Sequence, residues 1–554
     1  MSRHEPLASP VSRRSLIKGA AGVGLSAPAI AAGLAAPGKG AAQEPTPGGT
    51  LRLTLAASAN VNLNPIGVTT IGAFHLMSVM YDGLVCSSAT WEEVEPALAE
   101  TWEVSEDGLT YTFHLRQGVT WHDGQPFTAA DVEFTYTTIL TQAIGSYMAG
   151  NLTVIKGAQA YLDETAETVE GIVVVDDATI QFVLDAPNAP FVFAVLTQHS
   201  IIPRHVWEEV APEEMAKPGT WEQGQIGTGP FKFVTYEADR FLEFERYDDA
   251  WRGAPLLDKV QFIHVGTTPE AMAAALEAGD IDYTSVSATE FERLSANPEL
   301  VMSTKPIFNI RAFGVNVGKP YLQDVRVRQA IVHGIDRVGI CETILANMST
   351  PTNSLSPSAK WANTNLPAYE YDPELATSLL AEAGWDASQE IELSLYYQDQ
   401  PHKDSIAFVQ QQLGEIGITA NVVQLDGSAV QSYYYEDKTF DLMLLGYGVS
   451  PDFDEFRDIF ACDATWPAGQ NAMGYCNPQV DELFVQGRAT TDDVERKQIY
   501  DEAQVILADE LPWIPFYNLS LVGGFNARVQ DGDAIFNAWN RPYNWSIEKV
   551  WIAE

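Results

Sequence analysis

Residues Ala97 to Tyr136 read ALAETWEVSEDGLTYTFHLRQGVTWHDGQPFTAADVEFTY, a segment with the clearest local structure signals in the chain. Apolar and polar side chains alternate from Leu109 to Leu115, and this period of two predicts a half-buried strand. The Ser-Glu-Asp-Gly sequence at 105–108 is typical of a tight turn, because glycine tolerates positive φ. Together with the short apolar run Trp102 to Val104, these features predict a β-hairpin.

The same segment continues into a loop and then a helix. The residues from Trp121 to Pro126 are mostly turn formers. Thr128 can cap a helix that begins at Ala129, and Asp131 lies in the first turn, where the helix dipole favours a negative charge. A hairpin followed by a capped helix predicts a mixed α and β unit.

Length and composition limit the class of protein. The chain has 554 residues, more than one compact domain holds, so we expect two or more lobes. Apolar residues make up 46% and charged residues 19%, which is typical of a globular protein. The net charge of −42 argues against nucleic acid and anionic membrane surfaces as partners, because both would repel the chain. Whether this charge serves solubility alone or also steers cationic ligands stays open.

Residues 1–42 are interpreted as a twin-arginine export signal. Ser12 to Lys18 reads SRRSLIK, and Gly19 to Ala36 is weakly hydrophobic and rich in alanine and glycine. No cysteine ends this region, so we expect no lipid anchor, and no later stretch reaches the ~18 apolar residues of a membrane helix. The mature protein is therefore expected to be soluble and periplasmic. Three alanines are candidate cleavage points, namely Ala31, Ala36 and Ala42.

The cysteines fit an oxidising compartment. Cys462 and Cys476 flank one polar loop, and we predict a disulfide between them, which would contribute roughly 3 kcal/mol on the chain-entropy model. Cys86 and Cys341 are expected to be buried free thiols. The sequence contains no CxxC motif of a metal or redox site.

The second half of the chain predicts an α/β lobe. A strand from Glu390 to Tyr397, a helix whose core stripe runs from Ile406 to Ile416, and a strand from Ile418 to Leu425 form a strand–helix–strand unit. Such a unit implies a parallel strand pair. Further helices are expected over Ile71 to Val85, over Asp324 to Ile340 and, capped by Asp372, from Pro373.

Several longer segments are similar to those of one protein family and occur in the same order. They are GTGPFKF from Gly227, ERYDDAWRGAPLLDKVQF from Glu245, AALEAGDID from Ala274, DVRVRQAIVHGIDR from Asp324, YDPELATSLLAEAGW from Tyr371 and ILADELPWIPFYN from Ile506. With the opening segment, they resemble the extracytoplasmic solute-binding proteins, family 5, of peptide and nickel ABC importers. The resemblance extends over nearly the whole chain after the signal.

This resemblance implies an α/β fold, that of a two-lobed periplasmic binding protein (type II, cluster C-like) with an extra subdomain in the N-terminal lobe. It also implies a function, the capture of a small solute between closing lobes and its delivery to a membrane permease. The expected boundaries are 43–85 for the first part of lobe I, 86–215 for the extra subdomain, 216–305 for the second part of lobe I, 306–518 for lobe II and 519–554 for the return to lobe I.

In the family, the cleft is lined by an NLNP-like loop, by the extended crossing between lobes and by the loop after the strand FDLMLLGYG. Carried over to this sequence, the resemblance implies six ligand-binding candidates, Asn62, Asn64, Phe308, Tyr447, Trp466 and, in its QPHK loop, His402. The alternative for the aromatic residues is ordinary core packing, and for the histidine a solvated helix start.

Peptide-binding members pair the ligand's α-amino group with an aspartate in the loop after that strand. In this chain, Val449 occupies the register of that aspartate. An enclosed ammonium without its carboxylate would cost several kcal/mol, so we predict that simple peptides with free N-termini bind poorly. The alternative is that Asp452 or Asp454 reaches the ligand by a different loop path.

An enzymatic function is not expected. The sequence has no HExxH, no GxSxG and no Walker loop, and His205 and Glu208 could share one helical face but have no partner motif. We therefore predict no catalytic residues, no metal and no cofactor. The expected partners are a small-molecule or peptide ligand and the permease subunits of an ABC importer, with a monomeric protein. A periplasmic ligand sensor or a chaperone-like binding protein on the same fold is the alternative, and a hydrolase is least favoured.

Overall fold

A computed structural model gives the structure of the protein. It describes residues 44–55, 63–67, 71–88, 90–222, 225–266, 268–448, 450–467, 469–532 and 546–553. The chain divides into two units, Met1–Glu44 and Pro45–Glu554, and the architecture below is that of the second unit. The predicted export signal, Asn62 and Val449 lie outside the described residues.

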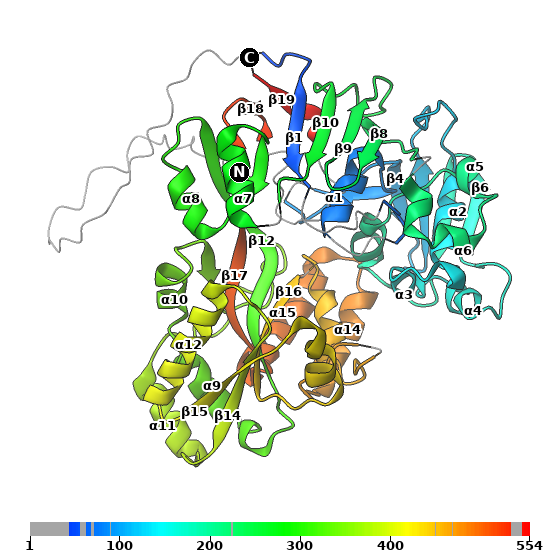
Figure 1. Ribbon diagram of the computed structural model, residues 1–554. Coiled ribbons are helices and arrows are strands. Elements are labelled where there is room, and N and C mark those ends of the chain that lie inside the picture. The colour runs from blue at the N-terminus through cyan, green and yellow to red at the C-terminus, as the bar shows by residue number, and fades with distance from the viewer. Residues whose placement is uncertain are drawn as a thin grey trace, which may run out of the picture. The chain divides into compact units, whose positions relative to one another are not determined.

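One mixed sheet of 11 strands organises this unit, in the order β15-β14-β16-β12-β17-β11-β1-β10-β9-β8 with β13 paired to β17. Its two longest strands, β12 (Leu300–Val315) and β17 (Trp513–Asn526), run antiparallel beside each other (Figure 1). Their register shifts between Pro306 and Ile310. We name the strands on the β11 side of this pair, with their helices, lobe I. Lobe II is formed by the strands on the β16 side, with their helices, and by the part of β12 that pairs with β16, Asn309–Val315.

Lobe I contains one end of the large sheet and three smaller described sheets, one of four strands in the order β4-β5-β7-β6, one formed by β2 and β3 and one formed by β18 and β19. A continuous apolar core joins the large sheet to the four-stranded sheet. The strands are β1 (Thr50–Thr54), β2 (Val85–Ser87), β3 (Val94–Pro96), β4 (Ala99–Val104), β5 (Thr110–Leu115), β6 (Ile172–Asp176), β7 (Thr179–Val183), β8 (Phe231–Glu237), β9 (Phe241–Arg246), β10 (Lys259–Ile263), β11 (Tyr283–Ser285), β18 (Val529–Gln530) and β19 (Trp551–Ile552). The helices are α1 (Ile71–Met80), α2 (Ala129–Ile139), α3 (Ala149–Leu152), α4 (Ala158–Leu162), α5 (Arg204–Trp207), α6 (Pro212–Met215), α7 (Pro269–Ala278) and α8 (Ala288–Leu294).

The opening segment of the sequence folds as predicted. β4 and β5 form the hairpin, and α2 begins at Ala129. The side chains of Thr128 and Asp131 form a capping box at its N-terminus, in which the aspartate accepts a hydrogen bond from the Thr128 amide at 2.9 Å. Such a box satisfies backbone groups that a helix start otherwise leaves unpaired.

Lobe II has the predicted strand–helix–strand unit, with β14 and β15 parallel and α12 between them in sequence. β16 also runs parallel to β14, and apolar side chains fill both faces of this sheet. The strands are β13 (Ser349–Pro351), β14 (Glu390–Leu395), β15 (Thr419–Gln424) and β16 (Leu442–Gly448). The helices are α9 (Val325–His333), α10 (Arg337–Thr343), α11 (Pro373–Ala383), α12 (Gln400–Glu415), α13 (Arg457–Phe460), α14 (Pro478–Ala489) and α15 (Asp493–Glu510).

Two predicted helices have different bounds in the structure. The helix expected over 71–85 ends at Met80, because the chain turns there and Val85 begins β2. The helix expected over 324–340 is two helices, α9 and α10. The carboxylate of Asp336 accepts a hydrogen bond from the Gly339 amide at 2.8 Å and so caps a new helix start, which the apolar periodicity did not reveal.

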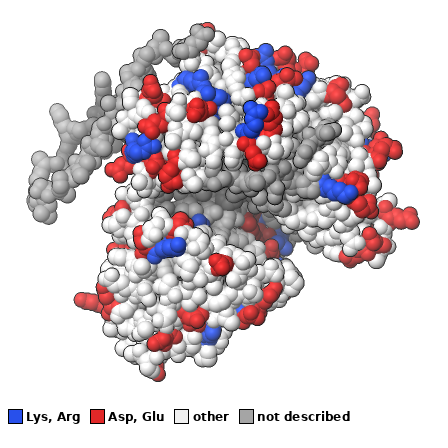
Figure 2. Space-filling view, viewed as in Figure 1, with Lys and Arg blue, Asp and Glu red and all other residues white. Residues whose placement is uncertain are grey.

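The structure joins Cys462 and Cys476 in a disulfide and buries Cys86 and Cys341 as free thiols. The predicted lobe boundaries at 305/306 and 518/519 fall within β12 and β17. Among the described residues, no helix has the length and apolarity needed to cross a membrane. On the face shown in Figure 2, acidic side chains are scattered over both lobes and the basic ones form no large patch.

Candidate ligand-binding cleft

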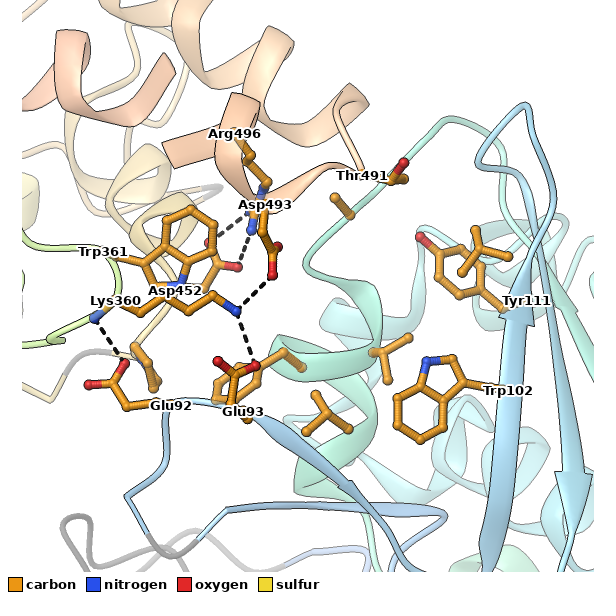
Figure 3. Close-up of a pocket in the computed structure, with 16 residues that line it drawn as sticks. Glu92, Glu93, Trp102, Tyr111, Lys360, Trp361, Asp452, Thr491, Asp493 and Arg496 are labelled. Atoms are coloured by element: carbon orange, nitrogen blue, oxygen red, sulfur yellow. Dashed lines mark hydrogen bonds and ion pairs between the residues drawn. The ribbon is translucent and has the colours of Figure 1, made fainter. Parts of the chain in front are cut away.

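A cavity of about 260 Å³ lies between lobe I and lobe II (Figure 3). Lobe I contributes Trp102 from β4, Tyr111 from β5 and Phe193. Lobe II contributes Trp361 and, from α15, Arg496. These side chains provide aromatic surface on opposite walls, an arrangement suited to enclosing a small ligand with apolar or ring-shaped parts.

Polar contacts connect the two lobes beside this cavity. The Glu92 carboxylate accepts hydrogen bonds from the Ser358 hydroxyl at 2.5 Å and from the Ala359 amide at 2.7 Å. The Lys360 ammonium lies 3.1 Å from Glu93 and 2.8 Å from Asp493 (Figure 3). The contacts therefore join the loop between β2 and β3 of lobe I to lobe II.

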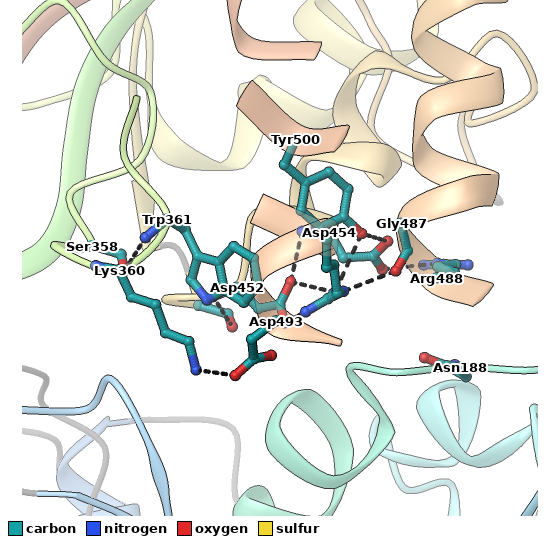
Figure 4. Close-up of polar contacts among 12 residues, drawn as sticks. Asn188, Ser358, Lys360, Trp361, Asp452, Asp454, Gly487, Arg488, Asp493 and Tyr500 are labelled. Carbon is teal, nitrogen blue, oxygen red and sulfur yellow. Dashed lines mark hydrogen bonds and ion pairs between the residues drawn. The ribbon is translucent and has the colours of Figure 1, made fainter. Parts of the chain in front are cut away.

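A buried ionic network forms part of the lobe II wall (Figure 4). The Arg496 guanidinium donates to both oxygens of Asp452, at 2.5 and 2.7 Å, and lies over the Trp361 ring. Asp454 accepts hydrogen bonds from Arg488 at 2.8 Å and from the Tyr500 hydroxyl at 2.8 Å. Each carboxylate of this network thus has a cation of the same lobe as its partner.

Of the residues predicted to bind ligand, Asp452 lines the cavity. Its carboxylate faces Arg496, however, so it is not available to a ligand ammonium. Phe308 lies behind the lining residue Phe193 and is separated from it by Trp91: the ring centroids of Phe308 and Trp91 are 5.3 Å apart, and those of Trp91 and Phe193 are 5.9 Å apart. Phe308 therefore supports the cavity wall across the two lobes.

The other predicted residues that the structure describes do not line this cavity. The Tyr447 hydroxyl accepts a hydrogen bond from Gln470 at 3.2 Å. Trp466 stacks on Tyr435 with ring centroids 5.1 Å apart. Both contacts involve the loop that the disulfide closes. Asn64 is buried in lobe I, where it accepts a hydrogen bond from the Ile66 amide and donates to the Met215 carbonyl.

His402 lies in the first turn of α12 and belongs to a polar cluster with Asp399, Arg311 and Tyr397. Its Nδ1 is 2.7 Å from Asp399, and its Nε2 accepts a hydrogen bond from Arg311 Nε at 3.0 Å. Its ring stacks on Tyr397 with centroids 4.1 Å apart. Burial alone would raise the pKa of the Asp399 carboxyl, but the hydrogen bond from His402 holds it below its usual value.

Sequence reasoning missed several residues that the structure brings to these sites. Trp361, Lys360 and Arg496 belong to segments whose position in space no local pattern reveals. Arg311 had a signal, because it is the one charged residue in the apolar end of β12, FNIRAFGV. Among the described residues, no group of three or more histidine, cysteine or acidic side chains is arranged to hold a metal ion.

Two lobes joined by paired strands, with a cavity lined from both sides, define a two-lobed solute-binding protein. The model of the bacterial extracellular solute-binding proteins, family 5, matches residues 93–467. The dipeptide-binding protein of Escherichia coli (strain K12) is 30% identical over 453 residues, which cover 78% of this chain and 82% of that protein. The chain therefore belongs to the bacterial extracellular solute-binding proteins, family 5.

Other relatives carry names that indicate different ligands. Heme-binding protein A of Haemophilus influenzae is 28% identical over 453 residues, which cover 79% of this chain and 81% of that protein. The crystal structure of the ABC transporter substrate-binding protein CtaP from Listeria monocytogenes superimposes with a TM-score of 0.80 at 27% identity, covering 92% of this chain and all of that one. The chain is thus a substrate-binding protein of the ABC importer type.

Proposed function

We propose that this protein is the periplasmic substrate-binding subunit of an ABC importer, which captures a small solute between its lobes and delivers it to a membrane permease. The observation that carries this proposal is the cavity lined from both lobes, which are joined through β12 and β17. In this proposal the protein reaches the periplasm by the twin-arginine route with residues 1–42 removed, acts as a monomer and catalyses no reaction.

The proposed ligand lacks a free ammonium group. A closed cleft removes water from the ligand, so an enclosed ammonium needs a carboxylate partner. Val449 stands in the register of the family's amino-pairing aspartate. The two nearby aspartates that could replace it, Asp452 and Asp454, are paired with Arg496 and Arg488. This pairing favours a solute other than an unmodified peptide.

The proposed movement is a hinge closure about β12 and β17. Their register shift between Pro306 and Ile310 interrupts regular pairing where the strands pass from one lobe to the other. An interrupted ladder bends more easily than a continuous one, so we expect rotation of the lobes to be concentrated there. Small-angle scattering with and without bound solute measures this rotation as a decrease in the radius of gyration.

Native mass spectrometry of protein purified from its source tests the function, because a bound solute adds its mass to that of the protein. Calorimetry with di- and tripeptides, oligosaccharides and metal chelates then tests the ligand class. We expect unmodified peptides to bind at least tenfold more weakly than the native solute, since each tenfold is about 1.4 kcal/mol. Tight binding of an unmodified dipeptide would contradict the proposed class.

A further inference from the structure

Arg311 is a buried arginine in the part of β12 that pairs with β16 and β17. Arg311 of β12 pairs in register with Gly446 of β16 and with Tyr517 of β17. It follows directly after the register shift that ends at Ile310. Only 8% of Arg311 is exposed.

The partners of this guanidinium are all uncharged. Nε donates to His402 Nε2 at 3.0 Å, Nη1 donates to Asn309 Oδ1 at 2.5 Å, and the group lies over the Tyr397 ring at 4.5 Å from its centroid. In the part of the chain that the structure describes, no carboxylate pairs with Arg311, and its Nη2 donates to no atom.

The histidine does not neutralise this charge. An arginine Nε–H only donates, so His402 Nε2 must carry the accepting lone pair. The single proton of the neutral imidazole is then on Nδ1 and is donated to Asp399. The Asp399 carboxylate is thereby used to orient the imidazole, and the imidazole in turn orients the guanidinium.

Two other buried arginines of lobe II give a direct contrast. Arg328 donates to the carbonyl oxygens of Glu510, Leu322 and Gln323. Arg337 donates to the carbonyl oxygens of Thr352, Pro515 and Tyr369 and to the side chain of Asn353. These two guanidiniums tie backbone segments together, whereas Arg311 contacts no backbone carbonyl in the described chain.

A second donor without an acceptor lies beside Arg311. The Tyr517 side chain is fully buried, and its hydroxyl has no hydrogen-bond partner among the described residues. Directly paired residues of neighbouring strands present their side chains on the same face. Burial raises the pKa of Tyr517, so the hydroxyl keeps its proton and remains a donor.

The position of the cluster is that of a ligand site in an α/β sheet. β14, β15 and β16 are parallel, and Tyr397 and His402 follow the carboxyl end of β14. In open α/β sheets, ligands bind beyond the carboxyl ends of the strands. Gly446 lets the Arg311 guanidinium lie against the strand, because a β-carbon at this position would be 2.3 Å from Arg311 Nη1.

We propose that Arg311 binds a carboxylate group of the solute, so that the transported substrate is a small organic acid without an ammonium group. The inference rests on the proposed function and narrows its substrate class. An anion would supply the acceptors that Arg311 and Tyr517 lack and would neutralise a charge that is otherwise costly to bury. A carboxylate oxygen can accept a charge-assisted hydrogen bond from the Arg311 guanidinium, and phosphate and sulfate are tested below as the alternative anions.

Calorimetry with matched probes tests this directly. We would titrate N-acetyl amino acids and N-acetyl dipeptides, aliphatic and aromatic, against their C-terminal amides, with inorganic phosphate and sulfate as further probes. We expect at least one acid to bind roughly tenfold or more tightly than its amide, and Arg311→Met to remove this difference. Equal affinity of acid and amide, an unchanged acid affinity in Arg311→Met, or binding of phosphate without any acid would overturn the proposal.

The stability of the unliganded protein provides a readout that needs no ligand. If Arg311 serves the solute, Arg311→Met should leave the melting temperature of the free protein unchanged or raise it. The matched variant Arg337→Met should lower it, because four acceptors lose their donors. A fall in Arg311→Met as large as in Arg337→Met would identify Arg311 as structural and refute the proposal. Absence of any co-purified solute would instead count against the proposed function.

Discussion

Two of the buried arginines of lobe II, Arg496 and Arg311, have opposite surroundings. Arg496, 3% exposed, has both oxygens of Asp452 as partners. Arg311, 8% exposed, has an imidazole, an amide and an aromatic ring. The first charge is neutralised within the protein, and the second is only held in position. Both arginines are buried, so burial alone does not distinguish a structural arginine from a ligand-binding one. The partners of the guanidinium make this distinction.

The physical reason is the cost of desolvation. A buried ion pair contributes little net stability, but removal of one member leaves the other uncompensated and is strongly destabilising. Arg311 has neither a counter-ion nor a backbone acceptor among the described residues, so its removal should not destabilise the free protein. The two arginines therefore predict opposite responses to mutation, and the following experiments test or refine that contrast.

The largest effect is expected where the neutralised pair is broken. Asp452→Asn removes the carboxylate beside Arg496 and should cost roughly 3–5 kcal/mol of unfolding free energy. Denaturant unfolding measures this cost. Asp493→Asn is the control, because the Asp493 side chain is 61% exposed and its pair with Lys360 should contribute at most about 1 kcal/mol. Equal stabilities of the two variants would contradict the contrast.

The second effect concerns the loop that places Gln470 against Tyr447 and Trp466 against Tyr435. Its disulfide, Cys462 to Cys476, spans a sequence separation of 14 residues. Replacement of both cysteines by serine should cost about 3 kcal/mol on the chain-entropy model. Peptide mapping of exported protein without reductant checks the bond itself, and two free thiols there would rule it out. The Arg311 cluster lies outside this loop, so binding of organic acids should persist in the variant.

The third effect concerns two buried histidines of lobe I, His199 and His122, whose burial should make the stability of the protein depend on pH. Burial lowers the pKa of His199 to about 3 and that of His122 to about 4. The unfolded histidines take up protons near pH 6.5, so between these values the unfolded state binds more protons than the folded state. Stability should therefore fall as the pH falls from about 6.5 towards 4, by up to about 1.4 kcal/mol per pH unit for each histidine.

Melting temperatures across this pH range test the prediction. His199→Leu removes one titrating group and should flatten the dependence, whereas replacement of the exposed His114 by leucine should leave the slope unchanged. A slope that is the same in His199→Leu and in the wild type would show that His199 does not contribute to acid sensitivity.

Local sequence signals predicted much of the fold. The hairpin and the capped helix at Ala129 were visible because alternation and capping are short-range patterns. The parallel pair of β14 and β15 followed from the strand–helix–strand order of that segment. The break between α9 and α10 was missed, because Asp336 caps a helix inside a segment that is apolar on one face throughout.

The site was predicted less well, because it depends on long-range contacts. Asp452 was considered as a partner for a ligand ammonium, but its pairing with Arg496, 44 residues away, cannot be read from either segment. His402 was named, whereas Arg311, 91 residues from it, was not. A lone charge in an apolar strand was the available signal, and its meaning emerged only from the uncharged groups around it.

The smallest expected effect concerns Glu92. Like Arg311, this residue is a charged group whose described partners carry no opposite charge. Glu92 pairs with no cation among the described residues, and its donors, the Ser358 hydroxyl and the Ala359 amide, belong to the opposite lobe. A carboxylate held only by donors of the other lobe loses them when the lobes separate, so it should favour the closed form by about 1 kcal/mol. Glu92→Ala should therefore raise the radius of gyration of the unliganded protein in small-angle scattering. Glu93→Ala is the control, because it removes only the exposed contact to Lys360 and should change scattering little. If both variants scatter like the wild type, contacts other than the Glu92 bridge must set the closure of the lobes.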